Sequence, residues 1–268
     1  MKKIIFIFIL SVLSACSFAF ASDKQDSYDT KPVIGGAFRS RFEYDITNQT
    51  HRFQVRNARV SIAGNISPVI GYYAKVDMCD RGNIKFLDAY GRFKLTDWLR
   101  IQAGRHSFPF SVVASRSPGT YYFSGHSYVE EFVGQIRGVG IQELLTIPKS
   151  NIYLDAGLFQ MHGADQSAWT TRFDYVGRLG WKSDNLKCEL GIESTVVDST
   201  RINMYDASIS WRYGRWMMEC EGLVKSYTHN HFNTAMAYNV ILDYVIPLPK
   251  LTFQQRSFQS RFDHMTHQ

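Results

Sequence analysis

The segment FRSRFEYDI, at positions 38–46, indicates a β-strand with one apolar and one charged face. Its apolar residues fall on even positions, namely Phe38, Phe42, Tyr44 and Ile46. Its charged residues fall on odd positions, namely Arg39, Arg41, Glu43 and Asp45. Because successive side chains of a strand point to opposite sides, the segment predicts a sheet that separates two different environments.

The same alternation recurs along the chain. It is found at 70–78, 87–95, 99–103, 152–158, 172–181, 186–193, 205–213, 216–224 and 236–246. In 216–224 the pattern is less regular, because Met217 and Leu223 fall on the charged face. Residues 52–64 and 135–147 are predicted strands whose register the pattern does not fix. Strands of about ten residues with a period of two are typical of transmembrane β-barrels.

Composition limits the class of protein. The chain has 268 residues, 45% of them hydrophobic and 15% aromatic, which excludes a disordered or collagen-like chain. No apolar run beyond residue 21 is long enough to cross a bilayer as a helix. A soluble β-sandwich or barrel is the alternative, since alternation alone allows it. The long strands and the aromatic residues near their ends favour the membrane barrel.

The connections between the predicted strands fall into two sets. Tight turns are expected at 65–68, 96–97, 148–150, 182–185, 214–215 and 247–250, and the connections on the other side are expected to be generally longer. One of these, at 105–134, is about thirty residues long and is the third loop on its side; loops of that length are usually functional.

The N-terminus predicts a secretory signal peptide over residues 1–21, followed by an N-terminal segment at 22–32. Lys2 and Lys3 precede an apolar stretch, and Ala19-Phe20-Ala21 has the small-x-small pattern of a cleavage site. Two alternatives are an uncleaved anchor helix and lipidation at Cys16, where Leu13-Ser14-Ala15-Cys16 is similar to a lipobox.

Cleavage after Ala21 would remove two lysines and lower the net charge from +6 to +4, too mild a charge to indicate nucleic acid as a partner. Three of the four cysteines would remain, an odd number that does not suggest a disulfide framework. We interpret them as small apolar wall residues.

Several short motifs together resemble the phosphate-selective porin O and P family. They are VRNARV at 55–60 followed by Gly64, YAKVD at 73–77, LDAY at 87–90, Gly104-Arg105 with FPF at 108–110, and RGVG at 137–140. The resemblance is best over 33–145, and RFD at 261–263 is similar to a later strand of the family. Asn57 departs from it, because the family more often has a second arginine there. The resemblance implies a trimeric outer-membrane barrel of sixteen strands whose third loop folds inward.

Arginine and lysine on the lumen side would guide anions, because arginine offers paired donors that match phosphate or carboxylate. The candidates on the wall are Arg39, Arg41, Lys75, Arg92, Lys94, Arg100, Arg172 and Arg178. The candidates on or beside the long loop are Arg105, Arg116 and Arg137. In the alternative interpretation, the interleaved acidic residues simply pair with these cations across strands. The loop also carries Glu130 and Glu131.

These observations predict an all-β protein, an antiparallel transmembrane β-barrel of the porin type over 33–263 with a tail at 264–268. About thirteen strands are counted, and because single-chain bacterial barrels close with an even number, we expect the chain to lack about three strands of the family's sixteen.

The predicted function is passive diffusion of small, phosphate-like anions through the outer membrane of a Gram-negative bacterium. The expected partners are outer-membrane lipid, these solutes and two further copies in a homotrimer, with no cofactor, no metal and no catalytic activity. The alternatives are an outer-membrane barrel enzyme and a secreted, soluble β-sheet binding protein. Neither a serine-nucleophile elbow nor a metal-binding helix motif supports the enzyme.

Overall fold

The computed structural model describes residues 30–266 except 81, 118–119, 121, 124, 126, 135, 162–168, 170, 198–199, 229–231 and 248–254. The predicted signal peptide and Cys16 lie outside the described residues. Within the described ranges, no helix is both long enough and apolar enough to cross a membrane.

Strands make up most of the described chain. The strands are β1 (Val33–Asp45), β2 (Thr50–Asn65), β3 (Ile70–Asp80), β4 (Asn83–Lys94), β5 (Leu99–Ser107), β6 (Arg137–Thr146), β7 (Ile152–Gln160), β8 (Asp174–Lys182), β9 (Leu186–Val197), β10 (Thr200–Tyr213), β11 (Trp216–Tyr227), β12 (Ala235–Pro247) and β13 (Gln255–Met265). One short helix, α2 (Tyr128–Val133), lies between β5 and β6. The last strand therefore reaches two residues beyond the expected boundary at 263.

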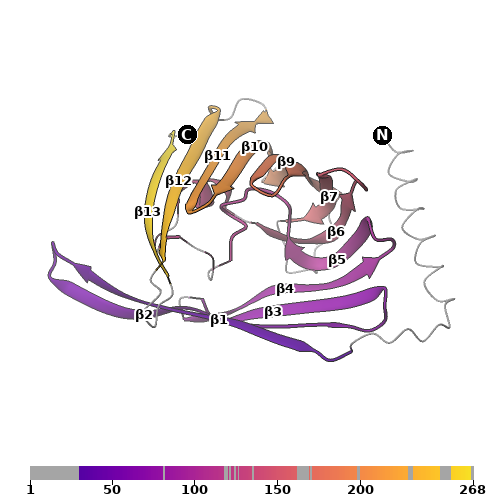
Figure 1. The fold of residues 1–268 in the computed structure, drawn as a ribbon, viewed down its shortest axis with the longest axis horizontal. Coiled ribbons are helices and arrows are strands. Elements are labelled where there is room, and N and C mark those ends of the chain that lie inside the picture. The colour runs from indigo at the N-terminus through magenta and orange to yellow at the C-terminus, as the bar shows by residue number, and fades with distance from the viewer. Residues whose placement is uncertain are drawn as a thin grey trace.

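Each strand pairs antiparallel with the next, and together they form one 13-stranded sheet that runs in chain order from β1 to β13. The sheet curls, so that β1–β4 face β9–β12 across an interior that holds the chain between β5 and β6 (Figure 1). The predicted all-β class and strand count are confirmed. Because every pairing is antiparallel, β1 and β13 run in the same direction, and an antiparallel barrel would need an odd number of further strands between them.

The pairings also fix the registers that the sequence pattern left open. In β2, Arg59 lies opposite Asp77 of β3, and Gln102 of β5 lies opposite Gln142 of β6. The register of β1 and β2 shifts between Arg39 and Ser40. An irregularity of this kind interrupts the alternation of faces, which explains why the pattern over 52–64 was ambiguous.

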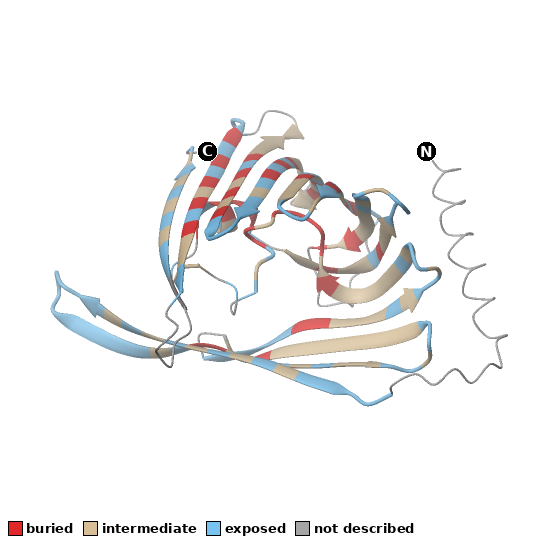
Figure 2. Cartoon of the chain, in the orientation of Figure 1, coloured by how far each residue is buried: buried red, intermediate tan, exposed pale blue. Residues whose placement is uncertain are grey.

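The burial of the two faces is the reverse of that in a soluble protein. On β10, Asp206 is 5% exposed while its neighbour Tyr205 is 48% exposed. The alternation of buried and exposed residues continues across β9–β12 (Figure 2). The buried row carries the carboxylates and the exposed row carries leucine, isoleucine and aromatic residues. A soluble sheet would bury the apolar row, so the soluble alternative does not fit this structure.

The tight turns expected at 65–68, 96–97, 148–150, 182–185 and 214–215 are confirmed, whereas the one expected at 247–250 falls on 248–254, outside the described residues. The connections on the other side are not uniformly longer. Only two residues separate β3 from β4, and two separate β9 from β10. At the first of these, Asp80 pairs with Asn83 and Gly82 has a φ of +96°, a conformation that glycine adopts readily. The long third connection is confirmed and runs over 108–136, starting three residues later than predicted because β5 continues to Ser107.

Candidate functional site

The lumen face of β1–β5, which we call the basic wall, carries more cations than carboxylates. Its cations are Arg39, Arg41, Arg52, Arg59, Lys75, Lys85, Arg92, Lys94 and Arg100. Its carboxylates are Glu43, Asp45, Asp77 and Asp88. Sequence reasoning missed Arg52 and Arg59, because the register of β2 was not fixed by its pattern.

Three predicted cations gather on β4 and β5 near the tight turn between these strands. Lys94 lies directly opposite Arg100, and Arg92 lies opposite Gln102. Among the described residues, no carboxylate lies within ion-pair distance of Arg92 or Arg100. Like charges directly opposite each other destabilise a sheet by about 0.2–1 kcal/mol. Stability of the sheet therefore does not explain this arrangement, which we call the cation cluster (Arg92, Lys94 and Arg100).

Lys94 is the only member of the cation cluster with an ion pair among the described residues. Its Nζ lies 2.7 Å from Oδ1 of Asp97 in the turn, and this hydrogen bond lowers the pKa of the Asp97 carboxyl. Arg92 instead donates to the hydroxyl of Tyr90 at 3.2 Å. Arg92 and Arg100 are both exposed, and the charge of Arg100 acts on the Asp155 carboxyl of β7 without a direct ion pair.

Other predicted cations are paired with carboxylates, as the alternative interpretation expected. Asp88 is shared by Lys75, at 3.2 Å, and Arg137, at 2.9 Å. Arg41 lies 3.0 Å from Glu43 on the same strand. These pairs reduce the charge that the basic wall offers to a solute.

The remaining predicted residues lie in different places. Arg178 lies on β8, with Nη1 3.6 Å from Oε1 of Glu189. Arg105 lies on β5 opposite Ala89 and Val139. Arg172 was expected on the wall, but it is exposed and precedes β8, which begins at Asp174. The prediction for Arg172 is wrong because alternation in a sequence does not show where a strand starts.

The lumen face of β8–β12, which we call the acidic wall, has the opposite character. Its buried carboxylates are Asp174, Glu189, Glu193, Asp206, Glu219, Glu221 and Asp243. Among the residues of the basic wall whose burial the structure describes, the buried carboxylates are Asp77 and Asp88. Burial of a carboxylate is costly unless the group is paired or hydrogen-bonded. Glu219 and Glu221 meet this cost through contacts with the loop described next, whereas oxygens of Glu193, Asp206 and Asp243 have no hydrogen-bond partner among the described residues.

The connection over 108–136, which we call the inner loop, is ordered locally by a capped helix. Ser127 is the N-cap of α2, and its hydroxyl accepts from the backbone N–H of Glu130 at 3.2 Å. The Glu130 carboxylate accepts in return from the backbone N–H of Ser127 at 3.2 Å. This reciprocal capping box satisfies two donors of the helix end. Glu130 is therefore engaged in the fold of the loop.

The inner loop packs its apolar side chains against apolar residues of the acidic wall. Phe108 and Phe110 of the loop belong to one buried cluster with Leu223, Ala235 and Ala237 of β11 and β12. Val129, Phe132 and Val133 of α2 complete the cluster from the loop side. Leu223 interrupts the charged row in the sequence because it faces the loop instead of water.

Polar contacts also join the inner loop to the acidic wall. The Glu221 carboxylate accepts from the backbone N–H groups of Val112, at 2.8 Å, and Val113, at 2.9 Å. Arg116 of the loop forms an ion pair with Glu219. The Arg116 guanidinium also lies 4.6 Å from the ring centroid of Tyr122, and burial raises the pKa of the Tyr122 phenol. The buried carboxylates of Glu219 and Glu221 thus hold the inner loop on the acidic wall.

The helical end of the inner loop is held by β11 and β13. Lys225 donates to the carbonyl oxygen of Phe132 at 2.5 Å. Arg261 donates to the carbonyl oxygen of Gly125 at 3.0 Å, and Asp263 accepts from the backbone N–H of Tyr128 at 3.3 Å. Sequence reasoning missed the role of Lys225, although it continues the odd-numbered charged row of Glu219 and Glu221.

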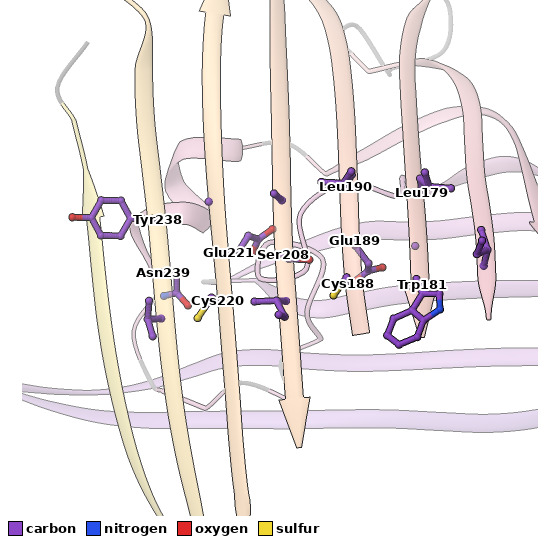
Figure 3. A pocket seen from close by; sticks show the side chains of 16 residues that line it. Leu179, Trp181, Cys188, Glu189, Leu190, Ser208, Cys220, Glu221, Tyr238 and Asn239 are labelled. Carbon is purple, nitrogen blue, oxygen red and sulfur yellow. The ribbon is translucent and has the colours of Figure 1, made fainter. Parts of the chain in front are cut away.

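The outer face of β7–β12 is apolar and carries a groove. A groove of about 650 Å³ crosses the strands from β7 to β12. Leu179, Leu190 and Trp181 line it together with small residues such as Cys188 and Cys220 (Figure 3). The prediction that these cysteines are apolar wall residues agrees with this position. In the described part of the chain, no three His, Cys, Asp or Glu side chains are arranged to hold a metal ion.

Comparison with known proteins identifies the fold. No protein-family model and no curated protein sequence matches the chain. Among solved structures, it is similar to OmpF of Salmonella typhi in complex with daunomycin, with a TM-score of 0.63 and 11% identity over 81% of this chain and 75% of that one. It is also similar to OmpT, an outer membrane protein of Vibrio cholerae in trimer form, with a TM-score of 0.58 and 9% identity over 87% of this chain and 78% of that one.

At this identity the likeness is one of fold. The chain has the antiparallel β-barrel fold of outer-membrane porins, which confirms the predicted fold class. No family model supports the narrower resemblance to the phosphate-selective porins. It remains a prediction that rests on the motifs quoted above.

Proposed function

We propose that this protein is an outer-membrane channel that lets small anionic solutes diffuse passively through its lumen. In this proposal the chain is a channel and not an enzyme, and the cations of the basic wall are its solute-facing groups. The fold supports the proposal, because a barrel with a polar lumen and an apolar outer face suits a membrane pore.

The proposal rests on one observation: the inner loop covers the acidic wall and leaves the cation cluster of the basic wall exposed. The inner loop packs on the acidic wall and engages Glu219 and Glu221. The cation cluster on the basic wall stays exposed, and among the described residues no carboxylate lies within ion-pair distance of Arg92 or Arg100. Fixed cations beside a constricted lumen lower the barrier for an anion and raise it for a cation. The preference for anions follows from this imbalance.

The outer face supports a location in the outer membrane of a Gram-negative bacterium. Large apolar side chains such as Leu190, which is 60% exposed, and Phe262, which is 62% exposed, would be covered by lipid chains. The groove across β7–β12 would be filled by the same lipid. The secretory signal expected at the N-terminus agrees with this location.

We extend the proposal to assembly. OmpT of Vibrio cholerae, which shares the fold, was solved in trimer form, and we propose a homotrimer for this protein. Migration of the unheated and heated protein on detergent gels tests the homotrimer, because a porin trimer resists dissociation without heat.

Liposome swelling tests the transport proposal most simply. Vesicles that contain the purified protein are diluted into isosmotic gluconate or into isosmotic arginine chloride. We expect faster swelling with small organic anions than with organic cations of equal size. Equal swelling rates, or swelling no faster than that of protein-free vesicles, would contradict the proposal. Phosphate, which the family resemblance implies as substrate, is tested as one of the anions.

A further inference from the structure

A carboxylate lies on the apolar outer face of the sheet. Glu143 of β6 lies directly opposite Ile101 of β5 and Ala156 of β7. Directly paired residues point to the same side of a sheet. Gln142, the chain neighbour of Glu143, points into the lumen and is 4% exposed. Glu143 therefore points away from the lumen, on the surface formed by β5, β6 and β7, which lie side by side (Figure 1).

Glu143 lies in the middle of the apolar band on its strand. Val139 and Ile141 are the outward residues on the loop side of Glu143, Leu145 is the outward residue on the turn side, and Ile147 lies in the turn. Ile141 is 39% exposed and Ile147 is 41% exposed. In the proposed outer-membrane location these side chains meet lipid chains. A carboxylate at that depth is costly, because hydrocarbon offers neither water nor a counter-ion.

The described part of the chain offers nothing that offsets this cost. Glu143 is half-buried, and its carboxylate has no hydrogen-bond or ion-pair partner among the described residues. The side chains of Ile101 and Ala156 beside it cannot donate. Small residues lie around it, namely Ala103, Ala156 and Gly177, the last directly opposite Ala156. Small side chains let the surface of another protein approach closely, so a donor from outside the chain can reach the carboxylate.

The same outer face carries a cation without a partner. Arg105 of β5 lies opposite Ala89 and Val139, which places it on the outer side, although sequence analysis expected it beside the lumen. Its Nε is shielded from solvent and has no hydrogen-bond partner among the described residues. Arg105 lies four residues along β5 from Ile101, the residue opposite Glu143, and the two charges of one chain do not pair. A second copy of the chain can bring an Arg105 to each Glu143.

We propose that this outer face, which we call the Glu143 face (Ala103, Arg105, Glu143, Ala156 and Gly177), is a contact surface for a second copy of the chain, whose Arg105 binds the Glu143 carboxylate. Around a three-fold axis the β5 side of one copy meets the β6 side of the next, so each copy gives one cation and receives another. A charge-assisted hydrogen bond is strong where water is excluded. The proposal deepens the proposed homotrimer, on which it rests, by naming the face that associates and the residues that hold it.

The mass of the full chain in detergent, measured by light scattering, together with unheated gel migration, tests the Glu143 face. Neither measurement needs conduction, so the contact and the channel can fail separately. Loss of one partner of a desolvated charge pair weakens association by about thirtyfold or more. Glu143→Leu should therefore dissociate on dilution where the wild type stays a trimer. A wild-type monomer would overturn the homotrimer and the contact together, and a Glu143→Leu trimer as resistant to dilution as a wild-type trimer would overturn the contact alone.

A double-mutant cycle tests the pairing of the two charges. Arg105→Gln should weaken association as Glu143→Leu does. The double variant should associate no more weakly than either single variant, because each single change removes the same contact. Losses that add in the double variant would contradict the pairing.

A matched control separates the contact from a general effect of charge. Asp184→Asn removes an exposed carboxylate in the turn between β8 and β9, and it should associate like the wild type. Heat-dependent migration of the monomer band shows that the barrel of each variant has folded. Dissociation of Asp184→Asn to the same degree as Glu143→Leu would contradict a specific role for the Glu143 face.

Discussion

The basic wall of β1–β5 and the acidic wall of β8–β12 are built from strands of the same kind, yet they differ in what covers them. The acidic wall carries Leu223, Ala235 and Ala237 among its charges, and the inner loop packs on these residues. The basic wall presents Arg92 and Arg100 without such a cover. The difference shows that lumen character is set by where the loop docks as well as by the charges of the strands.

Removing the cation cluster should have the largest effect. The triple variant Arg92→Gln, Lys94→Gln, Arg100→Gln removes the charge of the cation cluster from the basic wall. A focused field changes local ion concentration by tenfold or more, so we expect the anion-to-cation permeability ratio to fall by about tenfold. Reversal potentials in a KCl gradient measure this ratio. Asp243→Asn on the acidic wall is the comparison, and a larger shift there than in the triple variant would contradict the account.

Loosening the inner loop should have the next largest effect. In Glu221→Gln, only one oxygen remains for the N–H groups of Val112 and Val113, and one buried donor loses its partner. The expected cost is about 1–3 kcal/mol. We expect noisier and larger single-channel currents and faster proteolysis within the loop. Glu131→Gln, an exposed change on α2, should leave both unchanged.

A glycine substitution tests how tightly the basic wall is packed. Gly104 has a φ of +130°, and an added Cβ would lie 2.4 Å from the carbonyl oxygen of Ala89. Gly104→Ala should therefore lower the free energy of unfolding by about 1–3 kcal/mol. Gly222→Ala on β11 is the matched control, because an added Cβ there meets nothing within 4 Å. Urea unfolding in lipid vesicles compares the two, and equal losses of stability would show that the contact at Gly104 is unimportant.

The smallest effect concerns the like-charged pair. Arg100→Gln removes the repulsion with Lys94 across β4 and β5. The Arg100→Gln substitution should raise the free energy of unfolding by about 0.2–1 kcal/mol. Arg212→Gln is the control, because its partner Met217 is uncharged. A loss of stability in Arg100→Gln would mean that Arg100 has a structural role.

Alternation alone was enough to predict the strands and their two faces. Charged rows such as the one with Glu219 and Glu221 are buried, and apolar rows such as the one with Tyr205 are exposed. The period of two is a local property of the backbone, so a sequence pattern shows it directly. The position of the long loop between β5 and β6 was predictable for the same reason, since it is the stretch where alternation stops.

The contacts between distant segments were not predictable. The hydrogen bonds from Val112 and Val113 to Glu221 join residues more than 100 positions apart, and no local pattern encodes such a contact. Arg172 was misplaced because a strand boundary depends on pairing with the neighbouring strand. The sharing of Asp88 by Lys75 and Arg137 depends likewise on three strands meeting.

The reversal potential of the wild-type protein in a planar bilayer, under a tenfold KCl gradient, tests the central claim most directly. If the inner loop covers the acidic wall and leaves the cation cluster exposed to solutes, the potential should take the sign set by chloride. A potential with the sign set by potassium would show that the buried carboxylates, not the exposed cations, govern the lumen, and would contradict the account.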